Sequence, residues 1–147
     1  MGSRISFVSL AVLALTAVCF AGGARAGCIE VDAAADWTEV HGGGPIVSAY
    51  ASGLWTAHPD LRTVGPRGHH GVEGDRIAPP YPLGALLIAS EARQVWSYRD
   101  FERVLTGHLL ANAPAVFGRL FVRINDAADG LADNSGSVTF CLERPDG

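Results

Sequence analysis

The chain has 147 residues, which is enough for one domain and a short additional segment. All 11 of its basic residues are arginines, against 15 acidic residues, so the formal net charge is −4. This sign argues against a nucleic-acid surface, and it is better suited to a site for a cation or a neutral ligand.

The first element in chain order is an export signal, predicted at residues 1–26. Arg4 gives a positively charged start, residues 5–21 form an almost unbroken apolar run, and Ala24-Arg25-Ala26 is a small-x-small cleavage motif. Cleavage after this motif leaves one mature domain at residues 27–147. That domain keeps nine of the 11 arginines against 15 acidic residues, a formal charge of −6. We expect it to be secreted or periplasmic, with no stable membrane span.

Two alternative interpretations of the N-terminal segment stay open. An apolar run over residues 5–21 approaches the lower limit for a membrane span, but no cluster of positive charge follows it, as it would in an uncleaved anchor. The second alternative is a lipoprotein, because Ala26-Gly27 precedes Cys28. Arg25 argues against lipidation, since it stands where a leucine-like residue is expected.

The cysteines support cleavage of the signal. Removal of Cys19 leaves two cysteines, Cys28 and Cys141, near the two ends of the mature domain. An oxidising compartment would let them form a disulfide. Closing a loop of about 110 residues would add on the order of 4 kcal/mol of stability in the chain-entropy model. The alternative is a pair of buried free thiols.

The mature chain is predicted to be an all-β domain of the sandwich or barrel type, without internal boundary or repeat. Turn residues recur every eight to twelve positions, as at Gly42-Gly43-Gly44, between short stretches rich in β-branched and aromatic residues. Residues 91–104 also fit a helix, but we expect strands there. The predicted strands are residues 28–31, 37–40, 45–53, 84–90, 101–105, 109–111, 120–125 and 137–142.

Two of these strands alternate clearly between apolar and other residues. In strand 120–125, Leu120, Val122 and Ile124 share one face, and strand 137–142 repeats the pattern. Arg123 lies on the opposite face, so we expect it, like Arg119, to be solvated or paired with acids.

The segment between these two strands carries most of the polar chemistry. Residues 125–137 contain three carboxylates and two side-chain amides. Calcium binds six to eight oxygens from carboxylates, amides and carbonyls, and a bend at Gly130 would bring Asp126, Asp133 and Asn134 together. The spacing excludes an EF-hand, since no glutamate closes the loop. The same residues are also common in ordinary turns, so a purely structural loop is the alternative.

Several short motifs carry a family resemblance. They are Ala51-Ser52-Gly53-Leu54-Trp55, Gly65-Pro66-Arg67-Gly68, Pro82-Leu83-Gly84-Ala85-Leu86-Leu87-Ile88, Gly118-Arg119-Leu120, Arg123-Ile124-Asn125-Asp126 and Asp133-Asn134-Ser135-Gly136-Ser137. In this order, from about residue 37 to residue 142, the chain resembles the PA-IL-like calcium-dependent, galactose-binding bacterial lectins. The resemblance implies a jelly-roll-like β-sandwich of the galactose-binding-domain type.

The resemblance also implies one Ca²⁺ ion and a galactose-like carbohydrate bound to it through two adjacent hydroxyls. The implied metal ligands are the side chains of Asp126, Asp133 and Asn134 and the backbone carbonyls of His58 and Gly130. The implied sugar-contacting residues are Asp126, Ala127, Gly130, Asp133 and Asn134. A homo-oligomer is left open.

The chain departs from the family where further sugar contacts are expected. Residues 69–76 contain no secure match to the family's histidine and glutamine, and Val64 replaces an aromatic residue. The alternative function is therefore a non-catalytic envelope or secreted interaction module that keeps a structural calcium loop and binds no sugar.

The histidines, the tryptophans and the catalytic motifs were considered as further candidate sites. His69-His70 suggests a transition-metal site, with His41 and His58 as further candidates, but adjacent residues on a strand point apart, so we expect a polar surface loop. Trp37, Trp55 and Trp96 are candidate sugar-stacking platforms, although we expect core packing for the first two. The chain contains none of the common catalytic motifs, so we expect a protein that is not an enzyme.

Overall fold

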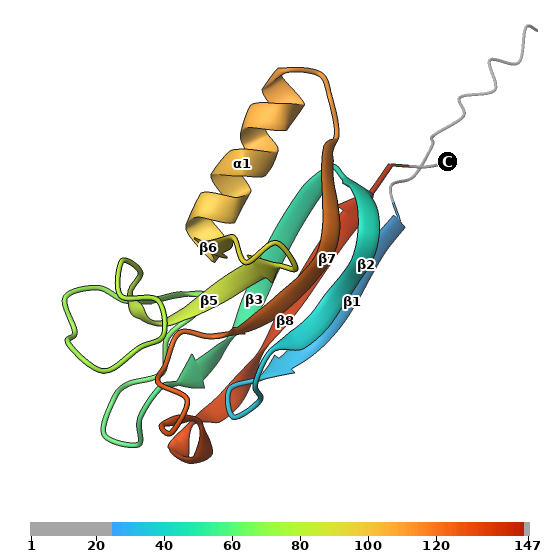
Figure 1. Cartoon of the computed structure of the whole chain (residues 1–147). Helices are drawn as coiled ribbons and strands as arrows, with labels where there is room; N and C mark the ends of the chain where they lie inside the picture. Colours follow the sequence, from blue (N-terminus) through green and yellow to red (C-terminus); the bar gives the residue numbers. More distant parts are fainter. Residues whose placement is uncertain (1–24, 146–147) are drawn as a thin grey trace, which may run out of the picture.

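The computed structural model describes residues 25–145, so nearly all of the predicted signal segment lies outside the described residues. The predicted β-sandwich is confirmed: two antiparallel sheets face each other (Figure 1). The elements are β1 (Arg25–Asp32), β2 (Thr38–Ile46), β3 (Ser48–Thr56), β4 (Arg67–His69), β5 (Leu83–Ser90), β6 (Val95–Ser97), α1 (Tyr98–Leu110), β7 (Ala115–Ile124), η1 (a 3₁₀ helix, Leu131–Asp133) and β8 (Ser135–Arg144). The cleavage site predicted after Ala26 falls within β1.

The two long C-terminal strands connect the sheets. One sheet has the order β1-β8-β3, and the other has the order β2-β7-β5-β4 with β6 paired to β5. β8 is thus central in the first sheet, and β7 is internal in the second. The acidic segment between them crosses from one sheet to the other at the end of the sandwich.

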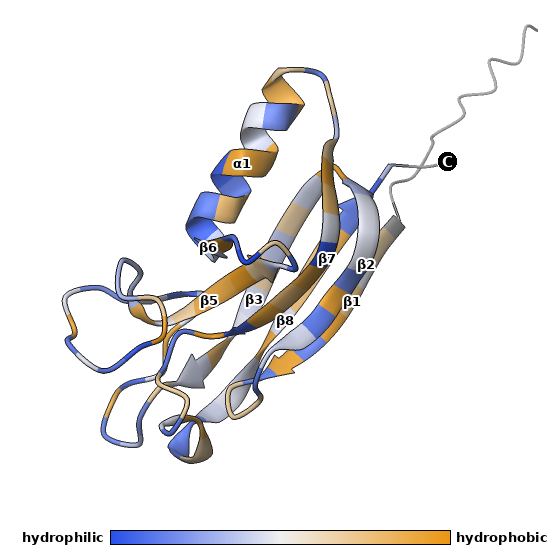
Figure 2. Ribbon diagram, viewed as in Figure 1, coloured by the Kyte–Doolittle hydropathy of each residue, from blue (hydrophilic) through white to orange (hydrophobic). Residues whose placement is uncertain are grey.

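The core forms between the inner faces of the sheets, where the predicted alternation is confirmed. Leu120, Val122 and Ile124 have no exposed area, and Val138 and Phe140 from β8 are equally buried. Figure 2 shows hydrophobic residues concentrated along β5 and β7. Complete burial of side chains of this size stabilises a fold by roughly 1.5–3 kcal/mol each.

The tryptophans divide between the core and the surface. Trp55 has no exposed area, and its indole N–H donates to the Gly84 carbonyl at 2.8 Å, which satisfies its one polar group. Trp96 is also buried. Core packing was wrong for Trp37, which is partly exposed just before β2.

The predicted strands at residues 101–105 and 109–111 are wrong, because this region is helix α1. Ser97 caps the helix by accepting a hydrogen bond from the Asp100 N–H at 3.2 Å. Tyr98, Phe101 and Leu105 are the buried residues of the helix, and their spacing of three and four places them on one face. The alternative helix at residues 91–104 had the correct type but began too early and ended too soon.

The predicted strand at residues 45–53 is two strands, since β2 ends at Ile46 and β3 begins at Ser48. The predicted turn at Gly42-Gly43-Gly44 lies inside β2 instead. Gly43 and Gly44 have φ values of 113° and 115°, which other residues rarely adopt, and a register shift occurs between Glu39 and His41. These glycines therefore bend the strand and do not terminate it.

Cys28 and Cys141 form the predicted disulfide, with an S–S distance of 2.10 Å. The two residues lie directly opposite each other in the β1–β8 pair. Cys141 is six residues along β8 from Ser135, the residue after Asn134, or about 20 Å at the usual rise per strand residue. The disulfide is therefore far from the acidic segment.

Candidate functional site

A hollow of about 440 Å³ opens among the loops at one end of the sandwich. Figure 1 shows these loops, which follow β3, precede β5 and follow β7, at the lower left. The loop between β7 and β8 lines one side of the hollow, and the loops after β3 and before β5 line the rest. Of the predicted site residues, the hollow is lined by His58, Asp126, Ala127, Gly130 and Asp133. Folding therefore brings His58 to the segment that follows β7, as the metal-site prediction requires.

Two side-chain oxygens of the predicted ligands are buried without a hydrogen-bond partner among the described residues, although Asn134, which carries one of them, is not among the residues that line the hollow. Asp126 is 5% exposed; its Oδ1 accepts from the Ala127 N–H at 2.8 Å, but its Oδ2 has no partner. Asn134 is 8% exposed; its Nδ2 donates to the Ala33 carbonyl at 3.2 Å, which leaves Oδ1 without a partner. An unpartnered buried polar atom costs about 1–3 kcal/mol. Both oxygens are of the kind that a hard cation binds.

Gly130 leaves space beside the Asp126 carboxylate. A Cβ atom at this position would lie 2.8 Å from Oδ2 and 3.0 Å from Oδ1 of Asp126. Its φ of −81° is open to any residue, so a side chain at this position would displace the Asp126 carboxylate and would not strain the backbone. The backbone at Gly130 therefore lies close to the Asp126 carboxylate. The predicted calcium site requires this proximity, because the Gly130 carbonyl and the Asp126 carboxylate are both predicted ligands.

The other two predicted ligands lie on the open side of the hollow. His58 and Asp133 have side chains that are 49% and 46% exposed, and His58 Nε2 lies 3.8 Å from Asp133 Oδ2. The His58 carbonyl, which is the predicted ligand, accepts from the Leu61 N–H at 3.0 Å. A carbonyl oxygen has a second lone pair, so this bond does not prevent it from binding a cation.

Sequence reasoning missed two acidic residues that also line the hollow, Glu73 and Asp75. They belong to the segment in which no match to the family's sugar contacts was found. The Asp75 carbonyl accepts from the Ala127 N–H at 3.2 Å, which joins this segment to the loop after β7. With Asp126, Asp129 and Asp133, five carboxylates line the hollow. Such a concentration of negative charge attracts a cation.

The loop before β5 is held in place by hydrogen bonds to the buried side chain of Asn125. Asn125 has no exposed area; its Nδ2 lies 3.0–3.1 Å from the carbonyls of Ala78, Tyr81 and Pro82, and its Oδ1 accepts from the Ala78 N–H at 3.1 Å. This side chain fixes the loop before β5, which carries Glu73 and Asp75.

Arg123 is paired with an acid, which is one of the two expected outcomes, but it is buried and not solvated. It is 3% exposed, and it donates to the Asp126 carbonyl at 3.0 Å and to Asp36 Oδ1 at 2.7 Å. Arg119 follows the expectation, since it is half-exposed and forms an ion pair with Glu39. Arg123 is buried because Trp37 lies over its guanidinium group, 5.8 Å from Cζ to the ring centroid.

The histidine pair does not belong to a metal-binding group of the described residues, although His69 Nε2 is buried without a hydrogen-bond partner among them. His69 is 3% exposed in β4, so the expected surface loop is wrong for this residue, whereas His70 is exposed. Burial lowers the pKa of His69, as expected for an imidazole removed from water. Within residues 25–145, no group of three or more His, Cys, Asp or Glu side chains is arranged to hold a metal ion. The predicted calcium set contains two carboxylates, with an amide and two carbonyls as its other ligands.

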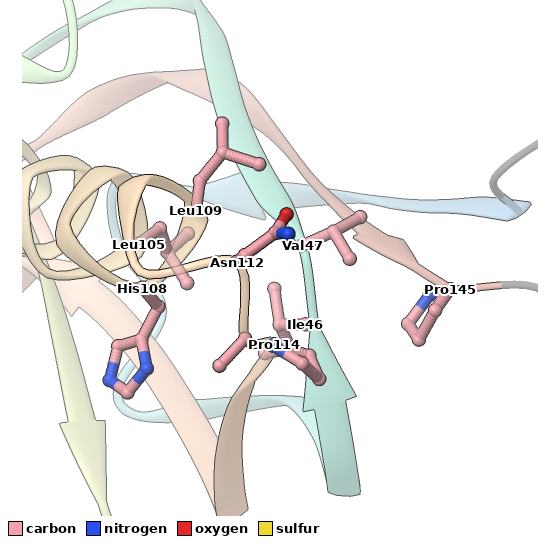
Figure 3. Close-up of a pocket in the computed structure, with 9 residues that line it drawn as sticks. Ile46, Val47, Leu105, His108, Leu109, Asn112, Pro114 and Pro145 are labelled. Carbon is pink, nitrogen blue, oxygen red and sulfur yellow. The ribbon is translucent and has the colours of Figure 1, made fainter.

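A second hollow, of about 210 Å³, lies toward the opposite end of the sandwich, beneath the C-terminal end of α1. Figure 3 shows Leu105 and Leu109 of the helix near Ile46, the last residue of β2, and Val47, which follows it. Its lining is mainly apolar and contains no acidic residue. The hollow among the loops is the better candidate site, because it combines a buried unpartnered carboxylate oxygen with a cluster of carboxylates.

Comparisons of the chain with known proteins assign no function to the site. No family model matches the chain, and no curated protein matches it. Across the described part of the chain, no helix is long and apolar enough to cross a membrane. The lectin resemblance and the calcium site therefore stay predictions.

Proposed function

We propose that this chain is an exported, calcium-dependent carbohydrate-binding protein of the galactose-lectin type. The observation that supports this most directly is the buried Asp126 Oδ2, which lacks a partner among the described residues in a hollow lined by five carboxylates; Asn134 Oδ1, eight residues further along the same loop, is likewise buried without a partner. The jelly-roll-like relationship, secretion and cleavage of the signal peptide belong to the same proposal. The Cys28–Cys141 disulfide supports export, since disulfides persist in oxidising compartments.

The residues of this chain fit a calcium ion by their chemistry. Asp126, Asp133 and Asn134 offer side-chain oxygens, and His58 and Gly130 offer carbonyls, all of which are hard ligands. When bound, the ion would coordinate two adjacent hydroxyls of the sugar and hold them at the open side of the hollow.

The protein residues then orient the sugar. Carboxylates on the open side, such as Asp133, accept hydrogen bonds from sugar hydroxyls, which are donors. The Asp126 carboxylate is kept in place by its bond from the Ala127 N–H. Glu73 and Asp75 line the same hollow, so they would adjust which galactose-terminated glycans bind.

The second candidate is an interaction module in which the ion is structural and no sugar binds. The observation that favours it is the acidic lining contributed by Glu73 and Asp75, in a segment that lacks the family's sugar-contacting pattern.

One experiment separates the two candidates. Mature protein and its Asp126→Ala variant are applied to a glycan array, in calcium and in chelator. The lectin proposal predicts binding of galactose-terminated glycans by wild type in calcium alone. Calcium binding by calorimetry without any glycan binding would favour the interaction module, and absence of both would contradict the calcium site.

A further inference from the structure

A third hollow, of about 390 Å³, lies on the outer face of the second sheet. It is lined by Trp37, Ala89, Ser90, Arg93, Val95 and Phe121, and none of these six residues is fully buried. Trp37 is the most accessible of the three tryptophans, since Trp55 is 0% and Trp96 is 8% exposed. Two aromatic side chains therefore reach the surface together at one concave place.

Both aromatic rings are held by arginines that are themselves fixed. Cζ of the buried Arg123 lies 5.8 Å from the Trp37 ring centroid, and Arg123 is anchored by Asp36. Arg119 lies 5.2 Å from the Phe121 ring centroid, and its Nε donates to Glu39 at 3.1 Å. Because the rings are already ordered, a ligand that packs against them loses less conformational entropy on binding.

Arg93 supplies an available cation at the same place. Its φ of 64° is in the left-handed region, where an arginine is uncommon and a glycine would be unstrained. The turn is closed by hydrogen bonds from the Arg93 N–H to the Ser90 carbonyl and from the Ser90 N–H to the Gln94 carbonyl, both at 2.9 Å. Arg93 forms no ion pair with any residue that the structure describes.

We propose that this hollow binds a sugar ring that carries a carboxylate or a sulfate group. The apolar C–H face of the ring would pack on Trp37 and Phe121, whose π faces are electron-rich. The anionic group would accept hydrogen bonds from the guanidinium of Arg93, which matches a planar or branched anion. None of the residues of this hollow is a predicted calcium ligand, so this proposal can be tested independently of the proposed calcium site.

The test is carried out in chelator, where the proposed calcium site is inactive. Galacturonic acid, galactose 6-sulfate and galactose are titrated into the mature protein, with tryptophan fluorescence and calorimetry as readouts. We expect saturable binding of at least one charged sugar, and binding of galactose at least about tenfold weaker because it lacks the ion pair with Arg93. The two charged sugars distinguish carboxylate from sulfate recognition.

Arg93 variants test the assignment without disturbing the aromatic rings. Arg93→Gln should weaken binding of the charged sugar by about tenfold or more, whereas Arg62→Gln, an equal charge change at an exposed arginine outside the hollow, should leave it unchanged. Arg93→Gly should lose binding and yet raise the melting temperature, because glycine relieves the positive φ.

Three results would overturn the proposal. They are absence of saturable binding of both charged sugars, equal affinity in wild type and Arg93→Gln, and self-association of wild type that disappears in Arg93→Gln. The last of these would make the hollow an interface between two copies of the chain.

Discussion

Asn125 and Asp126 are neighbours at the end of β7, and both are buried, but their hydrogen bonding differs. Asn125 satisfies both ends of its amide on the loop before β5, and Arg123 beside it is equally well paired. Asp126 uses one oxygen on the Ala127 N–H and leaves the other without a partner among the described residues, as Asn134 also does. The region of Asn125 is complete as a folded structure, whereas the region of Asp126 lacks a partner for its oxygens.

This difference gives a general way to separate structural from ligand-directed polar groups. A buried polar network whose members are all satisfied stabilises one conformation. Buried oxygens left unsatisfied beside a hollow lower stability unless a ligand supplies the missing interaction. Calcium should therefore stabilise the region of Asp126 and leave the region of Asn125 unchanged, and the following variants test that contrast.

The largest expected effect lies outside both regions and serves as a reference. Reduction of the Cys28–Cys141 disulfide opens a loop with a sequence separation of 113 residues and should lower the free energy of unfolding by about 4 kcal/mol. Thermal unfolding with and without reductant measures this change. Because the disulfide is remote from the acidic loop, the loss should be equal in calcium and in chelator. A free thiol titre of two in native, air-exposed protein would contradict the disulfide.

Asn125→Asp should destabilise the protein by about 3 kcal/mol. The substitution replaces the amide donor with a carboxylate oxygen among three carbonyls, which leaves several buried acceptors unsatisfied. Urea unfolding in calcium and in chelator should give the same loss, since this side chain belongs to the structural network. A loss that calcium restores would place Asn125 in the ligand site instead.

Gly130→Ala should weaken calcium binding by about tenfold, or about 1.4 kcal/mol, because the new Cβ would displace the Asp126 carboxylate. In chelator the effect should be smaller, since φ at this position suits alanine and the free carboxylate can rotate away. Calorimetric titration measures the affinity. Ala132→Gly, in η1 of the same loop, is the matched control for changing one methyl group. An affinity equal to that of wild type would mean that Asp126 does not bind the ion.

Asp133→Asn should have the smallest effect, below about 1 kcal/mol on calcium binding. The amide keeps an oxygen ligand, and the lost charge belongs to a side chain that is 46% exposed, where solvent screens it. The same titration measures it, and Glu91→Gln, an equal charge change at an exposed carboxylate outside the hollow, controls for the change in net charge. A loss as large as that of Asp126→Ala would mean that Asp133 is a principal ligand.

The sequence predicted those parts of the molecule that depend on local pattern. The alternation of Leu120, Val122 and Ile124 located β7, and two cysteines at the ends of the domain predicted the disulfide. Helix α1 was missed because aromatic residues also favour strands, although Ser97 at the cap and the spacing from Tyr98 to Leu105 were readable signals.

Other features depend on contacts between distant residues and could not be predicted. Glu73 reaches the hollow because the segment before β5 folds against the loop after β7. Arg123 is buried because Trp37, 86 residues earlier, covers its guanidinium group. Neither contact has a signature in the local sequence, since solvation and pairing of an arginine look alike until its neighbours are known.

The melting temperatures of wild type and Asp126→Asn, each in calcium and in chelator, test the central claim most directly. In chelator the variant should melt at or above wild type, because it removes one of five clustered negative charges and loses no ion pair. A hundredfold excess of calcium over its dissociation constant should stabilise wild type by about 2.7 kcal/mol and the variant much less, so the order of the two proteins should reverse. Magnesium should not produce this reversal, since it requires a tight octahedral site. Wild type that melts at the same temperature in calcium and in chelator would contradict the calcium site, and with it the proposed lectin function.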